Sequence, residues 1–177
     1  MKVLIAEDEK DVALSYKLAL EKNNHEVIIT TNGEECINMY RHKLDLISNS
    51  NGSWTLSQPE LPFFDAIILD YKMPKKDGMD VAKEILNLNP HERIIFASAY
   101  VKETLVDSVK QLKKVVELWQ KPFDMQALVD TIEDKEIYKG LEKLNVNVKK
   151  IKNLEPTHEQ LRDLLEGLRE IMKGRSF

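Results

Sequence analysis

The sequence is poor in cysteine and has no long hydrophobic run, and both shortages narrow the classes of protein that fit it. Cys36 is the only cysteine among 177 residues, so no internal disulfide can form, and a small buried apolar side chain is the plainest interpretation. No apolar run approaches the roughly 20 residues that span a bilayer. The segment MKVLIAEDEK turns acidic too early for the core of a signal peptide. We therefore expect a cytoplasmic protein.

Internal repeats, low-complexity segments and an excess of positive charge are also missing. Hydrophobic residues make up 42% and charged residues 32% of the chain, which is typical of a soluble globular protein. The net charge of −4 gives no general attraction to nucleic acid, so such binding would need a local basic patch. The length allows one domain of ordinary size with an appendage.

Short β-rich runs alternate with helical patterns through the first 135 residues or so, which indicates βαβ units around a parallel sheet. Asn32 and Asp124 are the expected caps of the second and fifth helices. The predicted class is α/β, with an open, doubly wound, five-stranded parallel sheet. We predict strands at 2–6, 26–30, 63–70, 93–98 and 115–120, and helices at 10–23, 33–47, 80–88, 102–113 and from 125 onward.

Two stretches interrupt this alternation. Residues 48–62 are polar, rich in turn-forming residues and longer than a usual connection. They join the end of a helix to the start of a strand, so they are expected opposite the functional edge of the sheet, either as a passive loop or, through Trp54 and the prolines, as a partner contact. The second stretch is the tail, residues 137–177, which belongs to no βα unit.

Apolar residues in the tail follow helical spacings. The first stripe predicts a helix, although residues 145–148 also have the character of a strand. The second stripe recurs every seven residues and predicts helices that pack on the rest of the chain or pair between subunits. The first stripe comprises Ile137, Leu141, Leu144, Val148 and Ile151, and the second comprises Leu154, Leu161 and Leu168 with Leu164 and Ile171 between them.

Charged and polar side chains gather where the predicted strands end. In a doubly wound sheet the functional crevice lies at the carboxyl ends of the strands. Converging carboxylates repel one another unless a cation neutralises them, and an all-oxygen ligand set fits Mg²⁺. A hydroxyl and an ammonium group suit a phosphoryl group, so the site is typical of an aspartyl phosphate. The residues at these ends are Glu7, Asp8 and Glu9, then Asp70, Ser98 and Lys121.

Four motifs occur in a fixed order: AEDE, ILDYKMPKKDG, FASAY and QKPF. In this order the sequence resembles the receiver family of two-component signalling, over roughly residues 1–136 apart from the insertion at 48–62. The resemblance implies a flavodoxin-like sheet with strand order 2-1-3-4-5, followed by a helical C-terminal extension over 137–177.

The resemblance also implies roles for the acidic residues. Asp70 is expected to be both the phospho-acceptor and a ligand of Mg²⁺. Asp8 should bind the metal directly, and Glu7 should act mainly through a bound water. The backbone carbonyl of Lys72 should complete the ligands that the protein supplies.

Other implied roles concern the phosphoryl group. Lys121 should pair with its oxygens, with a cis peptide before Pro122. Ser98 should move to bind it and draw the following loop toward the site. Lys72 and Tyr100 lie two residues after Asp70 and Ser98, where the family places residues that admit or screen the attacking water, and a bulky Tyr100 is expected to shield the phosphate.

One position departs from the family pattern. Receivers commonly carry a Tyr or Phe three residues before the lysine, and its ring turns inward when the Ser or Thr moves. Here that position is Leu118, followed by Trp119. Neighbours on a strand point to opposite faces, so Trp119 does not substitute without a shift of register. We expect a switch without this aromatic rotor, and ordinary packing for Trp119.

The implied function is a regulatory switch rather than an enzyme, phosphorylated by a sensor histidine kinase. Its output would be a downstream protein or a self-dimer, through helix four, strand five and helix five or through the tail. The main rival is a transcription regulator whose tail binds DNA, although Lys149, Lys150 and Lys152 make only a small basic cluster. A haloacid-dehalogenase-like phosphatase needs an aspartate where Lys72 stands. His158 is expected to face solvent.

Overall fold

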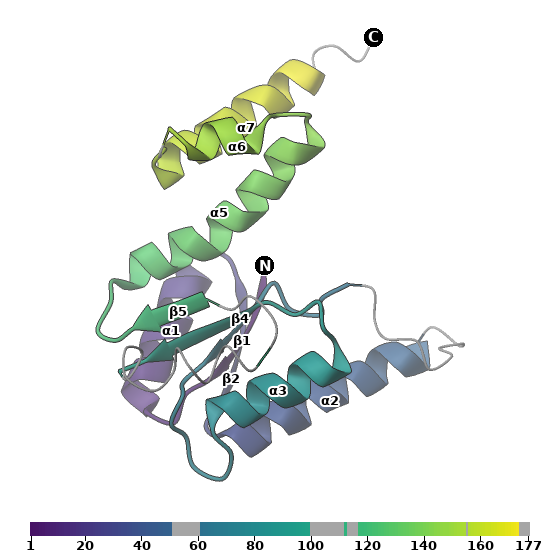
Figure 1. Cartoon of the computed structure of the whole chain (residues 1–177), viewed down its shortest axis with the longest axis vertical. Coiled ribbons are helices and arrows are strands. Elements are labelled where there is room, and N and C mark those ends of the chain that lie inside the picture. The colour runs from purple at the N-terminus through teal and green to yellow at the C-terminus, as the bar shows by residue number, and fades with distance from the viewer. Residues whose placement is uncertain (51–60, 100–111, 113–116, 155, 174–177) are drawn as a thin grey trace. The chain divides into compact units, whose positions relative to one another are not determined.

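Five short strands form one parallel sheet in the order β2-β1-β3-β4-β5 (Figure 1). The inner strands are buried throughout, because helices cover both faces of a doubly wound sheet. This arrangement confirms the predicted fold class and strand order. The strands are β1 (Lys2–Ala6), β2 (Glu26–Thr30), β3 (Ala66–Leu69), β4 (Ile94–Ser98) and β5 (Glu117–Gln120).

Helices α2 (Gly33–Ser50) and α3 (Gly78–Leu88) pack side by side against one face of the sheet (Figure 1). Leu4 and Ala6 of β1 belong to the apolar cluster on this face. Helix α1 (Lys10–Lys22) lies on the opposite face, because the right-handed crossover from β1 to β2 and the one from β2 to β3 run in opposite directions across the sheet. Asn32 caps α2 as predicted, since its Oδ1 accepts from the Glu35 amide at 3.0 Å.

The computed structural model describes residues 1–50, 61–99, 112, 117–154 and 156–173. Most of the insertion, including Trp54, and nearly all of the helix predicted at 102–113 lie outside these described residues. The chain divides into two compact units, Met1–Met125 and Gln126–Phe177. Within the described part of the chain, no helix is both long and apolar enough to cross a membrane.

Strand β3 begins later than predicted, at Ala66 rather than Phe63. The amides of Phe63 and Phe64 do not join the sheet ladder; they donate to the Glu92 carboxylate at 2.7 and 3.3 Å. Strand β5 is described from Glu117 onward, and helix α2 runs on to Ser50, beyond the predicted end near Ile47. These differences concern the ends of elements and leave the sheet unchanged.

The second unit contains α5 (Met125–Lys143), α6 (Val148–Lys152) and α7 (His158–Lys173). The first apolar stripe of the tail is not one continuous helix. The chain breaks after Lys143, where Asn145 adopts a φ of 60° and Asn147 caps α6. Residues 144–147 form no strand either. Helices α5, α6 and α7 nonetheless bury apolar residues in one cluster: Ile137, Leu141, Val148, Leu161 and Leu165.

Helix α7 follows the heptad pattern only in part: Leu161 and Leu168 pack in the cluster as the pattern indicates, whereas Leu164 and Ile171 are exposed and Leu165 is buried instead. Leu154 is 76% exposed. A Cβ on Gly140 would lie 3.0 Å from the Leu165 side chain, so this glycine permits close packing of α7 on α5.

The expectation of a solvent-facing His158 is wrong. Its side chain is only 16% exposed, and its ring nitrogens lie 2.7 Å from Asp134 Oδ1 and 3.2 Å from Glu133 Oε2. Two carboxylates of α5 therefore hold the first residue of α7, so the imidazole belongs to the packing of the helical unit. A sequence pattern cannot show this contact, because the partners lie on another helix.

Candidate functional site

The residues predicted to meet at the carboxyl edge of the sheet do lie together there. Glu7 and Asp8 follow β1, and Asp70 follows β3. Carboxylate oxygens of these three residues lie within 4.8 Å of one another. The register explains the convergence, because Ala6 pairs with Leu69 and so aligns the ends of the two strands. Glu9 lies apart from the carboxylate group and starts α1 as its N-cap residue.

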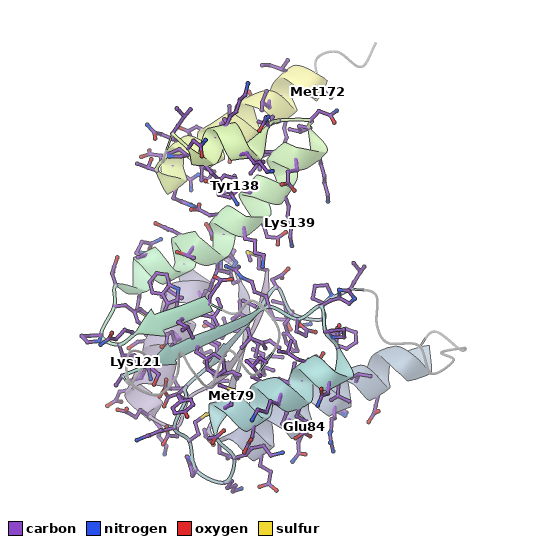
Figure 2. All side chains as sticks on the ribbon, in the orientation of Figure 1. Met79, Glu84, Lys121, Tyr138, Lys139 and Met172 are labelled. Atoms are coloured by element: carbon purple, nitrogen blue, oxygen red, sulfur yellow. The ribbon has the colours of Figure 1, made fainter. Side chains whose placement is uncertain are left out.

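Lys121 enters this acidic group from the end of β5 (Figure 2). Its Nζ lies 2.6 Å from Glu7 Oε2 and 3.5 Å from Asp70 Oδ1. The Lys121 amide also donates to the Ser98 carbonyl at 2.9 Å, which joins the ends of β4 and β5. The peptide between Lys121 and Pro122 is cis, as the family resemblance implies. One ammonium group thus contacts two carboxylates at once.

Burial makes the charges of this site costly. Glu7 is 1% exposed and the Asp70 side chain 12% exposed. Burial raises the pKa of the Glu7 carboxyl, Lys121 opposes the rise, and the charge of Asp70 adds to it. Burial likewise raises the pKa of Asp70, against the effect of Lys121 and the Tyr71 amide. Both carboxylates therefore bind protons or cations more readily than exposed ones do.

The loop after Asp70 is fixed by a close backbone approach. A Cβ on Gly78 would lie 2.1 Å from the Asp70 carbonyl oxygen, so only glycine fits there. The Gly78 amide donates to the Tyr71 carbonyl at 2.9 Å, and the Asp77 side chain caps α3 through the Asp80 amide at 2.8 Å. This confirms that the Asp77–Gly78 turn starts the helix.

Ser98 and Lys72, two further predicted site residues, are both among the described residues. Ser98 ends β4 and is 1% exposed, at the same edge as Asp70 and Lys121. Lys72 lies in the loop between Asp70 and Gly78, with an exposed side chain. Tyr100, the predicted shield, lies outside the described residues.

The donor set fits a hard divalent cation. Glu7, Asp8 and Asp70 offer only carboxylate oxygens, the ligands that Mg²⁺ takes in one or two copies beside water. Asp8 is exposed, so one side of the carboxylate group is open to solvent. Three carboxylates share one ammonium group, that of Lys121, and burial raises the pKa of Glu7 and Asp70 in spite of it. A metal ion at this edge would supply the missing positive charge.

The family model of the response regulator receiver domain matches residues 3–133. The chain belongs to this receiver family. A DNA-binding transcriptional regulator NtrC from Azospirillum brasilense is 30% identical over 74% of this chain, and the match spans 23% of that protein. The sporulation initiation phosphotransferase F of Bacillus subtilis is 23% identical over 74% of this chain and 90% of its own length.

Solved structures agree with this assignment. A response regulator receiver domain protein from Clostridium thermocellum superposes with a TM-score of 0.57 at 26% identity, covering 75% of this chain and 91% of that one. Receivers are signalling switches of two-component systems that typically bind Mg²⁺ in an acidic pocket and interact with histidine kinases and downstream partners. The acidic edge described above stands where such a pocket is expected.

Leu118 and Trp119 of β5 pack on opposite faces of the sheet. Leu118 packs into the apolar cluster of the α2–α3 face. Trp119, its neighbour, meets Phe123 edge-on at a ring distance of 5.3 Å, and Phe123 contacts Tyr16 of α1 at 6.1 Å. Trp119 therefore points to the α1 face, as strand alternation predicts, and does not replace the aromatic rotor.

Tyr16 is the feature of this region that sequence reasoning missed. Tyr16 lies on α1 and is buried, at 1% exposure. Its hydroxyl, however, has no hydrogen-bond partner within the described part of the chain. A tyrosine among aliphatic residues on the inner face of a helix was the available signal, because its hydroxyl needs a partner when buried.

Proposed function

We propose that this receiver is a two-component response regulator that accepts a phosphoryl group on Asp70 from a sensor histidine kinase, with Mg²⁺ as cofactor. One observation carries the proposal. The carboxylate oxygens of Glu7, Asp8 and Asp70 lie within 4.8 Å of one another, and Lys121 reaches two of them. Clustered anionic oxygens beside a buried ammonium group suit the binding of a cation and a phosphoryl group together.

In the proposed transfer, a carboxylate oxygen of Asp70 attacks the phosphorus atom of a phosphohistidine. The new P–O bond forms as the P–N bond breaks, and the leaving imidazole keeps the electron pair and takes up a proton. Asp8 and Asp70 would hold Mg²⁺ directly, Lys72 through its backbone carbonyl and Glu7 through water. When bound, the metal neutralises charge on the phosphoryl oxygens and orients them.

The remaining polar residues hold the product. Lys121 turns from Glu7 toward the phosphoryl oxygens, and the Ser98 hydroxyl donates a hydrogen bond to one of them. The signal ends when a water attacks the phosphorus atom and the P–O bond to Asp70 breaks. That step releases inorganic phosphate and restores the Asp70 carboxylate. The receiver thus catalyses only its own phosphorylation and dephosphorylation.

The proposed output is a change in partner binding or in dimerisation, in the cytoplasm. We assign residues 1–136 to the receiver and 137–177 to a helical extension, and the surface would include β5 and α5 or this extension. A DNA-binding tail is the alternative. Within the described residues its basic cluster lies on the five-residue helix α6, where Lys152 Nζ stands 4.7 Å above the Tyr138 ring. So short a basic helix does not favour a recognition helix.

Phosphoryl transfer is tested with the full chain, MgCl₂ and acetyl phosphate, followed by intact-mass spectrometry. We expect the mass of one phosphoryl group to be added to the wild type, and no addition to Asp70→Asn or after chelation by EDTA. Asp80→Asn is the matched control, because Asp80 is an exposed carboxylate in the first turn of α3. Equal labelling of Asp70→Asn and wild type would overturn the assignment of Asp70.

The output is tested by measuring the mass of the protein in solution with MgCl₂ and beryllofluoride, a mimic of the phosphoryl group. A shift from monomer to dimer would support self-assembly as the output. An electrophoretic shift assay on random genomic fragments, with and without the mimic, tests the DNA alternative. A shift of the DNA that is lost when Lys149, Lys150 and Lys152 are replaced would favour the transcriptional role over the protein-partner role.

A further inference from the structure

Two tyrosines among the described residues of the unit Met1–Met125 are fully buried, and their hydroxyls differ in their hydrogen bonds. The Tyr40 hydroxyl donates to Glu92 Oε1 at 2.9 Å. The Tyr16 hydroxyl has no partner among the described residues, although Tyr16 is 1% exposed. A buried hydroxyl without a partner lowers stability, whereas phenylalanine would fill the same space without that loss. The unphosphorylated structure therefore gives no reason for a hydroxyl at this position, and its role is to be sought in the phosphorylated state.

The surroundings of Tyr16 connect it to the acidic edge. The ring stacks at an angle on Phe123, which follows directly after Lys121 and Pro122. Tyr16 and Lys121 line one pocket of about 400 Å³. Burial, then the negative charges of Glu7 and Asp70, raise the pKa of the Tyr16 phenol. The phenol thus stays protonated, as a potential hydrogen-bond donor whose pKa responds to the charges of the two carboxylates.

Lys121 is shared in a way that leaves one carboxylate short of a partner. In the resting structure its Nζ is 2.6 Å from Glu7 and 3.5 Å from Asp70, so it mainly neutralises Glu7. Within the described part of the chain, the Glu7 carboxylate also accepts from the Glu9 amide, but at 3.4 Å, which is long for a hydrogen bond. When Lys121 turns to a phosphoryl group on Asp70, Glu7 loses its short contact while it remains buried.

We propose that Tyr16 is a positioning residue that replaces Lys121 as the donor to Glu7 in the phosphorylated state. As Lys121 moves to the phosphoryl group, the Tyr16 hydroxyl donates a hydrogen bond to the Glu7 carboxylate. This inference rests on the proposed function of Asp70 and Lys121. The hydroxyl has no partner before phosphorylation and gains one afterwards, so its hydrogen bond stabilises only the charged state. Tyr16 then acts on the phosphoryl site through Glu7 and Lys121, without touching the phosphoryl group.

The test compares Tyr16→Phe with Tyr40→Phe, a matched pair in which each substitution removes one buried hydroxyl. Two quantities are measured on the full chain: the free energy of unfolding without ligand, by urea titration, and the affinity for beryllofluoride in MgCl₂, by calorimetry. We expect Tyr16→Phe to unfold at an equal or higher urea concentration, yet to bind beryllofluoride about tenfold more weakly. Tyr40→Phe should unfold at a lower urea concentration and bind beryllofluoride as the wild type does.

The outcomes separate this inference from the proposed function. If the wild type binds beryllofluoride and Tyr16→Phe binds it equally well, Tyr16 has no positioning role and only this inference fails. A loss of stability in Tyr16→Phe without a loss of affinity would show a merely structural hydroxyl and would also overturn it. If the wild type itself does not bind beryllofluoride in MgCl₂, the proposed phosphoryl site fails.

Discussion

The two ends of the sheet each bury a glutamate, and they treat it in opposite ways. Glu92, before β4, is 2% exposed and accepts from the Tyr40 hydroxyl and the amides of Phe63 and Phe64. Asn89 adds a further donor at 3.2 Å. Glu7, after β1, is 1% exposed but depends on Lys121, which it shares with Asp70. The first carboxylate is saturated with donors, and the second is left short of them.

This difference separates a structural carboxylate from a functional one. Burying a carboxylate is tolerated when fixed donors surround it, as they do at Glu92. At the acidic edge the donors are few and movable, so the site keeps capacity for a cation and a phosphoryl group. The functional end of the sheet is marked by a buried carboxylate with few hydrogen-bond donors, and burial alone does not mark it.

Removing the saturated carboxylate should have the largest effect on folding. Glu92→Ala leaves the Tyr40 hydroxyl and the two backbone amides without an acceptor, so we expect a loss of about 3 kcal/mol in the free energy of unfolding. Urea titration measures this change. Binding of Mg²⁺, followed by calorimetry, should stay as in the wild type. Weaker magnesium binding in this variant would contradict the claim that Glu92 is a structural carboxylate with no part in the acidic edge.

Magnesium bound at the acidic edge should raise the free energy of unfolding. At a concentration 100 times its Kd, a ligand of the folded state adds about 2.7 kcal/mol to the free energy of unfolding. We expect this gain for the wild type in MgCl₂ and a much smaller gain for Asp8→Asn, because Asp8 is proposed to bind the metal directly. Asp80→Asn should keep the full gain. Thermal unfolding with and without EDTA provides the measurement.

Neutralising Asp70 should stabilise the metal-free fold by about 1 kcal/mol at neutral pH. Its pKa is raised in the folded state, so the folded protein holds more protons than the unfolded chain between the usual Asp pKa and the raised value. The stability that Asp70 contributes therefore falls as the pH rises through that interval. We expect Asp70→Asn to exceed the wild type most at neutral pH and to approach it on acidification. Urea titrations in EDTA across this range would contradict the account if the gap widened toward low pH.

The ion pairs of Glu84 should matter least. Glu84 of α3, labelled in Figure 2, contacts Arg41 of α2 and Lys76 of the preceding loop. Surface ion pairs contribute little because water and salt screen them, so Glu84→Gln should cost about 0.5 kcal/mol or less and leave magnesium binding intact. An effect as large as that of Glu92→Ala would show that burial is not what distinguishes these carboxylates.

The sequence predicted the sheet and the acidic edge because both follow from local patterns. Apolar runs locate the strands, and the residue after each strand is fixed at one edge by topology, which brings Asp70 and Lys121 together. The saturation of Glu92 was not predictable in this way, since all of its donors except Asn89 lie 28 to 52 residues away along the chain. The same holds for the unpartnered hydroxyl of Tyr16 and for the contacts of His158, which depend on three-dimensional packing.

The break between α5 and α6 shows another limit of pattern reading. The spacing of Ile137, Leu141 and Val148 fits one helix, yet Asn145 and Asn147 end one helix and cap the next. The apolar residues still reach one cluster, because α6 folds back onto the same core. Periodicity identified the buried residues, and local turn chemistry decided the path of the chain.

The most direct test of the contrast between the two ends uses one matched pair of variants. Glu7→Gln and Glu92→Gln each replace a buried carboxylate by an amide of the same shape, and the free energy of unfolding is measured with and without MgCl₂. The account predicts that Glu7→Gln is at least as stable as the wild type without magnesium and loses much of the magnesium gain. Glu92→Gln should be less stable and keep the full gain. Equal behaviour of the two variants would contradict the claim that the carboxyl edge is built for a cation and a phosphoryl group.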